Sequence, residues 1–129
     1  MRVLVVDDDA IVIKSCRRIL EVEGFEVMAV RSADEALENI KNFGFSLLLI
    51  DIKMPKRDGI FLIREIKKEW PEIPILVMSG YPTPETIAAV LKSGATQFIP
   101  KPFRLDELIQ AVHQVIQSGV KKKSFPAAA

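Results

Sequence analysis

The chain has 129 residues, enough for one domain with a modest core, because single domains commonly run to roughly 100 to 200 residues. Its 49% of hydrophobic and 27% of charged residues are typical of globular domains and exclude a disordered or fibrous chain. Lys and Arg number 18 and Asp and Glu 17, so the net charge of +1 creates no overall field toward nucleic acid or an anionic membrane. We therefore expect no direct contact with nucleic acid or with a membrane.

The chain shows no segment typical of export or membrane insertion. The longest apolar run, residues 87–91, is far shorter than the roughly 20 residues of a membrane-spanning helix. The amino terminus reaches acidic residues without the apolar segment of a signal peptide. The lone Cys16 cannot form an internal disulfide and is expected to be a small core residue. These features predict a cytoplasmic domain.

The first half of the chain predicts three strands and two helices. A strand at 3–6 precedes an acidic run whose last residue, Asp9, is suited to cap a helix that Gly24 should end. After a strand at 25–30, Ser32 and Glu35 have the spacing of a capping box, and Gly44 should end this second helix. A third strand is predicted at 47–50.

The second half continues the alternation, with a third helix that should end after Trp70, where two prolines precede a fourth strand at 75–78. A fourth helix, ending at Gly94, leads to a short fifth strand at 97–99. The last helix carries an apolar stripe at helical spacing, formed by Leu105, Leu108, Ile109, Val112, Val115 and Ile116.

Several strands are apolar at consecutive positions, which is typical of a parallel sheet covered on both faces. Five strand–helix repeats joined by right-handed crossovers predict an α/β fold, a doubly wound five-stranded parallel sheet. Gly119 should stop the last helix, so that residues 1–119 form the domain and residues 120–129 a tail or the start of a linker.

Polar residues stand at the carboxyl ends of four predicted strands. They are Asp7 and Asp8, Asp51, Ser79 and Lys101, in chain order. Ligands of open parallel sheets bind at this edge, so we expect these side chains to surround one point. Taken together, carboxylates, a hydroxyl and an ammonium group are suited to accept a phosphoryl group.

Adjacent carboxylates repel one another unless protons or a cation lie between them, and a site with only oxygen ligands suits Mg²⁺ or Mn²⁺. Asp51 could be a second cation ligand or a nucleophile, because Asp can form an aspartyl-phosphate. Taken singly, Asp9 is better explained as a helix cap, Lys101 could be a surface lysine, and Ser79 could cap a strand end.

The ordered set of motifs resembles the receiver domain of two-component response regulators, the CheY-like family. The resemblance covers about residues 2–118 and is carried by Val5-Val6-Asp7-Asp8-Asp9, Asp51-Ile52-Lys53-Met54-Pro55, Asp58-Gly59, Ser79-Gly80 and Lys101-Pro102-Phe103. It implies the flavodoxin-like (βα)5 fold with strand order 2-1-3-4-5. It also implies a signalling domain that catalyses only its own phosphorylation and dephosphorylation, and not an enzyme.

The resemblance makes Asp51 the phosphoryl acceptor. Mg²⁺ or Mn²⁺ would be held by Asp51, by Asp8 directly, by Asp7 partly through water, and by the backbone carbonyl of Lys53. The Lys53 side chain could also point into the site and compete with the cation. Lys101 would pair with the phosphate.

The remaining motif residues would shape the site and the switch. The bond before Pro102 would be cis, an isomer found in about 5 to 6% of such bonds in folded proteins, and Gly80 would leave room for the phosphoryl group. Ser79 matches the family's switch hydroxyl and Phe98 its switch aromatic, although Phe98 could equally be a core ring. Phosphorylation would then change the surface of the fourth helix, fifth strand and fifth helix.

The implied partners are a sensor histidine kinase, an output domain or protein partner, and a second copy of the chain in a phosphorylation-dependent homodimer. Residues 83–101 resemble receivers of enhancer-binding transcription regulators. A free-standing receiver and one cut from a longer regulator or hybrid kinase would share every residue named above.

Two other function classes fit the sequence less well. A phosphatase of the haloacid-dehalogenase type needs an acid two residues after its nucleophile, where this chain has Lys53. A flavodoxin-like cofactor site needs a first loop that attracts phosphate, and three consecutive aspartates would repel it.

Overall fold

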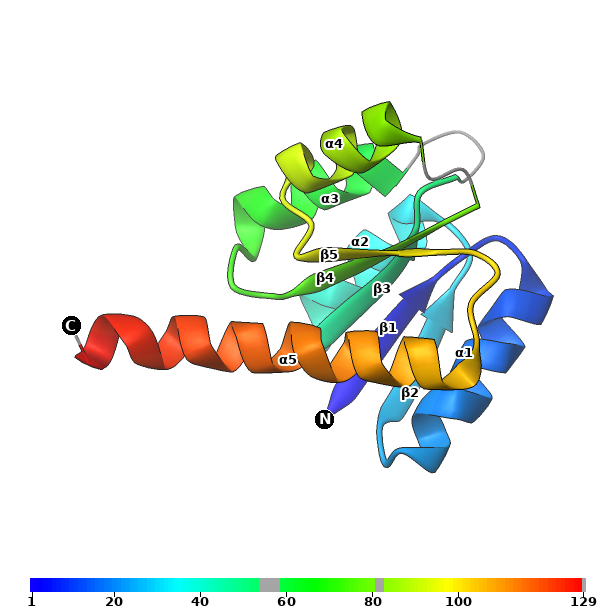
Figure 1. Ribbon diagram of the computed structural model, residues 1–129, viewed down its shortest axis with the longest axis horizontal. Coiled ribbons are helices and arrows are strands. Elements are labelled where there is room, and N and C mark those ends of the chain that lie inside the picture. Colours follow the sequence, from blue (N-terminus) through cyan, green and yellow to red (C-terminus); the bar gives the residue numbers. More distant parts are fainter. Residues whose placement is uncertain (54–58, 81–82, 129) are drawn as a thin grey trace.

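The computed structural model describes residues 1–53, 59–80 and 83–128, with the backbone alone for 118–128. Strands and helices alternate along the chain (Figure 1). Their bounds are β1 Arg2–Val6, α1 Ala10–Val22, β2 Glu26–Val30, α2 Ala33–Asn42, β3 Leu47–Asp51, α3 Gly59–Glu69, β4 Ile75–Ser79, α4 Pro84–Ser93, β5 Gln97–Pro100 and α5 Leu105–Ala128. The predicted strands therefore lie within one residue of the observed ones at each end.

The strands form one parallel sheet in the order β2-β1-β3-β4-β5, which confirms the expected fold. The last residue of β1, Val6, is paired with the end of β2 and with Ile50 of β3. Asp51 is paired with Met78, one residue before the end of β4. The register thus brings the carboxyl ends of β1, β3 and β4 to one edge of the sheet.

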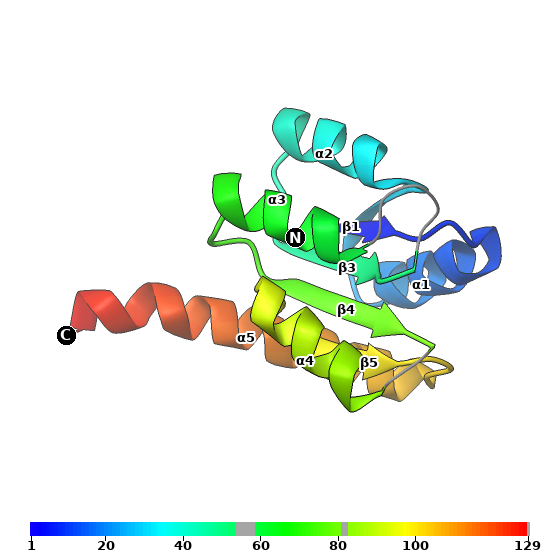
Figure 2. The ribbon, with the colours of Figure 1, turned by 90° about the horizontal axis from the view of Figure 1, so that it is seen from above.

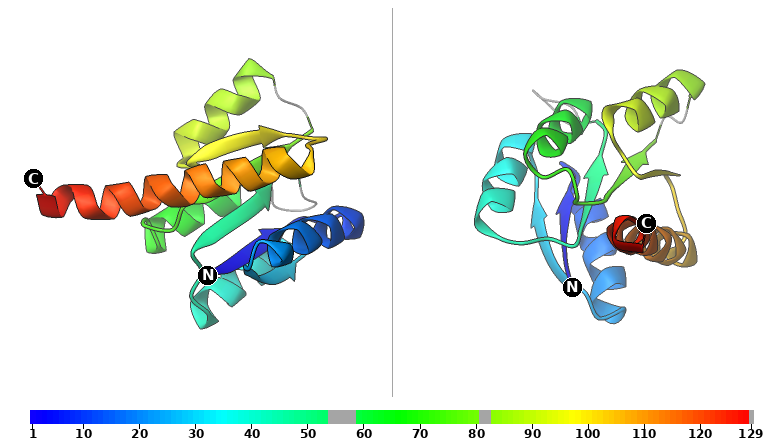
Figure 3. Two further views of the ribbon diagram at one scale, coloured as in Figure 1. Left: turned by 60° about the horizontal axis from the view of Figure 1, so that its bottom comes forward. Right: turned by 90° about the vertical axis from the view of Figure 1, so that its left-hand side faces the viewer.

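The sheet is covered by a helix layer on each face. One layer is α2, α3 and α4, in which α3 contacts both neighbours, and the other is α1 and α5 (Figures 2 and 3). In β1, Leu4 and Val6 pack toward the first layer and Val3 and Val5 toward the second, and all four are fully buried. Burial on both faces explains why the strands are apolar at consecutive positions.

The predicted N-terminal caps of α1 and α2 are present, the second with one change. Asp9 caps α1 by accepting a hydrogen bond from an N–H of its first turn at 2.9 Å. Ser32 caps α2 by accepting from the Glu35 N–H at 3.2 Å. The Glu35 carboxylate, however, accepts from the Arg31 N–H at 3.1 Å and so closes the capping box one residue earlier than expected.

The predicted end of the last helix at Gly119 is wrong, because α5 continues to Ala128 and extends beyond the sheet (Figures 1 and 3). A glycine inside a helix costs only about 1 kcal/mol relative to alanine. The positive φ with which glycine ends a helix occurs at Gly24, 92°, and at Gly94, 120°. No helix in the described part of the chain is long and apolar enough to span a bilayer.

Candidate functional site

Asp7, directly after β1, is a fully buried carboxylate. One of its oxygens accepts from the Lys101 ammonium at 2.9 Å, and the other accepts from the Asp9 backbone N–H at 2.9 Å. A buried carboxylate is tolerated when it is paired with a positive charge and hydrogen-bonded, and these two partners meet both conditions for Asp7.

Asp51 is the last residue of β3 and is 5% exposed. Burial, reinforced by the charge of Asp7, raises the pKa of Asp51 to about 6, from an ordinary value of 3.8. Lys101, 3.4 Å away, and a hydrogen bond from the Lys53 backbone oppose this rise. The surroundings therefore disfavour the ionised form of Asp51, and a cation bound beside it would stabilise that form.

The carboxylates of Asp7, Asp8 and Asp51 form one cluster, in which an oxygen of each lies within 4.8 Å of the others. With Lys101 the formal charge of the group is −3 + 1 = −2 when all three are ionised, which a divalent cation would balance. Oxygens bound to Mg²⁺ at about 2.1 Å lie at most about 4.2 Å apart. The three carboxylates are therefore close enough together to hold a hard divalent cation, and the donor set fits one.

Lys101, in the loop after β5, carries the positive charge of the site. Burial alone would lower the pKa of Lys101, but its hydrogen bonds and charge interactions with Asp7 and Asp51 raise the pKa above its ordinary value. Its backbone N–H donates to the carbonyl of Ser79 at 2.7 Å, and the following bond to Pro102 is cis, as the resemblance implies. The lysine is thus charged and fixed beside the cluster.

Ser79 is fully buried at the end of β4, where it is paired with Pro100 of β5. In the sheet it lies between the strand of Asp51 and the strand that leads to Lys101, the position expected from the sequence. Its backbone bond to Lys101 couples the two strand ends directly.

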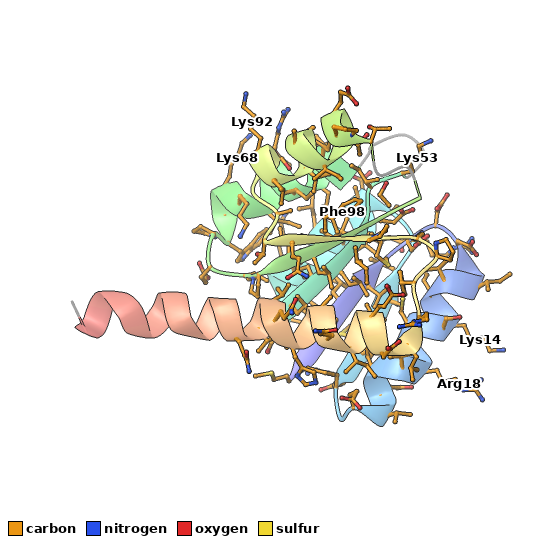
Figure 4. All side chains as sticks on the ribbon, in the orientation of Figure 1. Lys14, Arg18, Lys53, Lys68, Lys92 and Phe98 are labelled. Atoms are coloured by element: carbon orange, nitrogen blue, oxygen red, sulfur yellow. The ribbon has the colours of Figure 1, made fainter. Side chains whose placement is uncertain are left out.

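Phe98 is paired with Val77, two residues before Ser79 in β4. Its side chain is partly buried against the core under α3 and α4 (Figure 4). The residue is also among those that line a cavity of about 270 Å³ between β5 and α5. The Phe98 side chain thus packs on the α3 and α4 face of the sheet, and the cavity lies on the α5 face.

Other residues of the motifs lie at the edge of the site or outside it. Lys53 is exposed beside the end of β3 (Figure 4). Asp9 acts as a helix cap, and a Cβ added at Gly80 would meet no described atom within 4 Å. Met54, Pro55 and Asp58 lie outside the described residues.

Two residues support the site without a role predicted from the sequence. A Cβ added at Gly59 would lie 2.7 Å from the Ile52 Cα and 2.8 Å from the Asp51 carbonyl oxygen, so only glycine lets α3 begin this close to the strand end. Its place in the Asp58-Gly59 motif was the available signal. The second support is Arg31, whose guanidinium donates to the carbonyl of Asp8 and which no motif marked.

An apolar cavity of about 660 Å³ adjoins the site between α1 and the loop after β5. It is lined by Ile11, Val12, Ser15, Cys16, Gly80, Lys101, Pro102 and Phe103. Burial, with a contribution from Asp7, raises the pKa of Cys16 to about 12, so its thiol stays protonated. Cys16 is a core residue, as expected from the sequence.

Comparison with known proteins places this geometry in a family. The model of the response regulator receiver domain matches residues 3–113. Response regulator MprA of Mycobacterium avium (strain 104) is 35% identical over 117 residues, which are 91% of this chain and 51% of that protein. MprA of Mycobacterium bovis (strain BCG / Pasteur 1173P2) is 34% identical over 117 residues, which are again 91% of this chain and 51% of that protein. The chain spans about half the length of these curated relatives.

Solved structures agree over nearly the whole chain. NtrX from Brucella abortus in complex with ADP has a TM-score of 0.94 at 33% identity, and the match covers 99% of this chain and 30% of that one. A CheY-like receiver domain protein from Methanospirillum hungatei JF-1 has a TM-score of 0.89 at 34% identity, covering 94% of this chain and 97% of that one. The chain therefore belongs to the CheY-like response regulator receiver domains of two-component systems, a signalling family and not a class of conventional enzymes.

Proposed function

We propose that this domain accepts a phosphoryl group on Asp51 and transmits the change to an output domain or partner. The observation that supports this most strongly is the setting of Asp51, a buried carboxylate with Asp7 and Asp8 within 4.8 Å and the Lys101 ammonium at 3.4 Å. A nucleophile surrounded by groups that can neutralise an incoming phosphoryl group is what phosphoryl transfer requires.

In the transfer, an oxygen of Asp51 attacks phosphorus and forms the O–P bond. The P–N bond to the imidazole of a sensor histidine kinase breaks, and its electron pair returns to the ring nitrogen. Lys101 stays beside the new phosphoryl oxygens and offsets their charge, and the Ser79 hydroxyl donates a hydrogen bond to them.

Asp7, Asp8 and Asp51, together with the backbone carbonyl of Lys53, would hold Mg²⁺ or Mn²⁺. When bound, the cation would offset the negative charge that gathers on the phosphoryl oxygens. The contribution of the chain is to keep three carboxylates within reach of one ion, with Asp7 anchored by Lys101.

The switch that we propose runs from Ser79 to the surface of α4, β5 and α5. When the Ser79 hydroxyl moves toward the phosphate, its backbone bond to Lys101 carries the movement to the end of β5. Space opens behind β4, and the partly buried ring of Phe98 rotates inward. Phe98 has no hydroxyl to hold the inward rotamer, so burial of the ring must stabilise it.

We place this domain in the cytoplasm, where a sensor histidine kinase would be its donor and the altered surface would meet an output domain, a protein partner or a second copy in a homodimer. The curated relatives are about twice as long as the matched region, which supports a further domain as the output. Transcription control is the output that residues 83–101 favour, with any DNA contact made outside this domain.

Phosphorylation by a small donor tests the proposal. Incubated with acetyl phosphate and Mg²⁺, the wild-type chain should gain one phosphate by intact-mass spectrometry, and Asp51→Asn should gain none. Asp9→Asn, which changes a capping carboxylate two residues from Asp7, is the matched control and should still be labelled. Labelling of Asp51→Asn to the wild-type level would contradict the assignment.

A further inference from the structure

Arg31 follows β2 and reaches back over the loop that carries two of the clustered carboxylates. Its Nη2 donates to the carbonyl oxygen of Asp8 at 2.8 Å, and its Nε approaches the same oxygen at 3.3 Å. Arg31 itself is exposed and Asp8 is half-buried. The contact joins residues 23 positions apart in the sequence.

The neighbours of Asp8 are anchored by other bonds. The backbone N–H of Asp7 donates to the carbonyl of Val30 at 3.2 Å, and the Asp7 carboxylate accepts from the N–H of Asp9 at 2.9 Å. The Asp8 carbonyl and the Asp9 N–H belong to one peptide unit, so the Arg31 guanidinium holds its carbonyl side while the Asp7 carboxylate holds its N–H side. The orientation of that peptide plane fixes ψ of Asp8, one of the two backbone dihedrals that set the direction in which the Asp8 side chain leaves the backbone.

We propose that Arg31 is a positioning residue that keeps the Asp8 carboxylate directed into the cation site. The inference rests on the cation binding that forms part of the proposed function. Groups that orient metal ligands commonly change metal affinity by about 10- to 100-fold when they are removed. Because the guanidinium is exposed to water, we expect the smaller loss of about three- to tenfold for Arg31→Ala.

The positive charge of Arg31 should change the affinity for Mg²⁺ in the opposite direction from its orientation of Asp8, so the two effects can be told apart. A positive group near three carboxylates weakens their attraction for a cation, so charge alone predicts that Arg31→Ala binds Mg²⁺ more tightly. Loss of the orientation of Asp8 predicts instead that Arg31→Ala binds Mg²⁺ more weakly. The sign of the change in affinity therefore separates the two effects.

The experiment is calorimetric titration of Mg²⁺ into wild type, Arg31→Ala, Arg31→Lys and Arg18→Ala. Arg18 is an exposed arginine more than two turns along α1 and points away from the domain (Figure 4), so its removal controls for the loss of one positive charge. We expect weaker binding for Arg31→Ala, partial recovery for Arg31→Lys, which can still donate one hydrogen bond, and no weakening for Arg18→Ala.

A second readout needs no metal. The amide NMR signals of Asp8 and Asp9 in metal-free protein should move in Arg31→Ala and stay in place in Arg18→Ala. If wild type binds Mg²⁺ but Arg31→Ala binds it equally or more tightly, Arg31 does not position Asp8. If wild type binds no Mg²⁺, the proposed function fails instead, so the two failures are distinguishable.

Discussion

At the scale of single residues, Asp51 is a carboxylate whose ionisation opposes folding. Burial and the charge of Asp7 raise its pKa to about 6 in the folded chain, above the ordinary 3.8. A group with a raised folded-state pKa contributes stability that is fully present below about pH 3.8 and is lost as pH rises through about 6. At neutral pH the metal-free domain therefore contains an ionised group that its surroundings disfavour.

Asp51→Asn should accordingly stabilise the metal-free domain at pH 7, by about 1 to 3 kcal/mol of unfolding free energy. The gain should shrink as pH falls from 6 and vanish near pH 4, where wild type is protonated. Urea unfolding in EDTA at several pH values measures this. Asp106→Asn, at an exposed aspartate paired with Arg104, is the control and should change stability by less than about 1 kcal/mol. Loss of stability in Asp51→Asn at pH 7 would contradict the account.

The sequence predicts which charged and polar side chains meet at the site but not the residues that support them. Asp51, Ser79 and Lys101 each end or follow an apolar run, so strand periodicity and the rule for parallel sheets locate them together. Arg31 acts on a backbone carbonyl, and any residue offers a carbonyl, so no side-chain pattern reveals the pair. Full burial of Asp7 likewise depends on packing by segments distant in sequence.

At the scale of elements, the start of α3 is fixed by the absence of a side chain at Gly59. Gly59→Ala should destabilise the domain by about 1 to 3 kcal/mol, because its Cβ would collide with backbone atoms of β3 and Ile52 that cannot turn aside. Gly44→Ala is the matched control, since a Cβ there meets nothing within 4 Å. The denaturant midpoints of the two variants, measured against wild type, give the loss of stability that each substitution causes. A Gly59→Ala domain as stable as wild type would show that α3 shifts freely.

Element boundaries could be predicted where a local interaction sets them. Asp9, Ser32 and Gly94 act within one turn of their own helices, and each was located from sequence. Gly119 shows the limit of this reasoning, because glycine favours a helix end through its access to positive φ, which it need not adopt, and α5 passes through Gly119.

At the scale of the whole molecule, the sheet order connects the acidic cluster to a distant surface. β4, which ends in Ser79, lies between β3, which carries Asp51, and β5, which carries Phe98, and Lys101 links Asp51 directly to the loop between β5 and α5. In the switch that we propose, a change at Asp51 reaches α4 and α5 through Ser79 and Lys101. Moving a population from 1:99 to 99:1 requires about 5.5 kcal/mol of differential stabilisation. One hydroxyl supplies only about 1 kcal/mol, so phosphate, cation and Lys101 must act with it.

Amide NMR with beryllofluoride, which stands in for the phosphoryl group on Asp51, tests this central claim most directly. With Mg²⁺ and beryllofluoride, wild type should show shift changes across residues 83–103, which include α4 and β5 as well as Lys101 beside the acidic cluster. Asp51→Asn should show none, and Ser79→Ala should bind the analogue but change this region incompletely. Changes in wild type confined to the acidic cluster, or the full change in Asp51→Asn, would contradict the account.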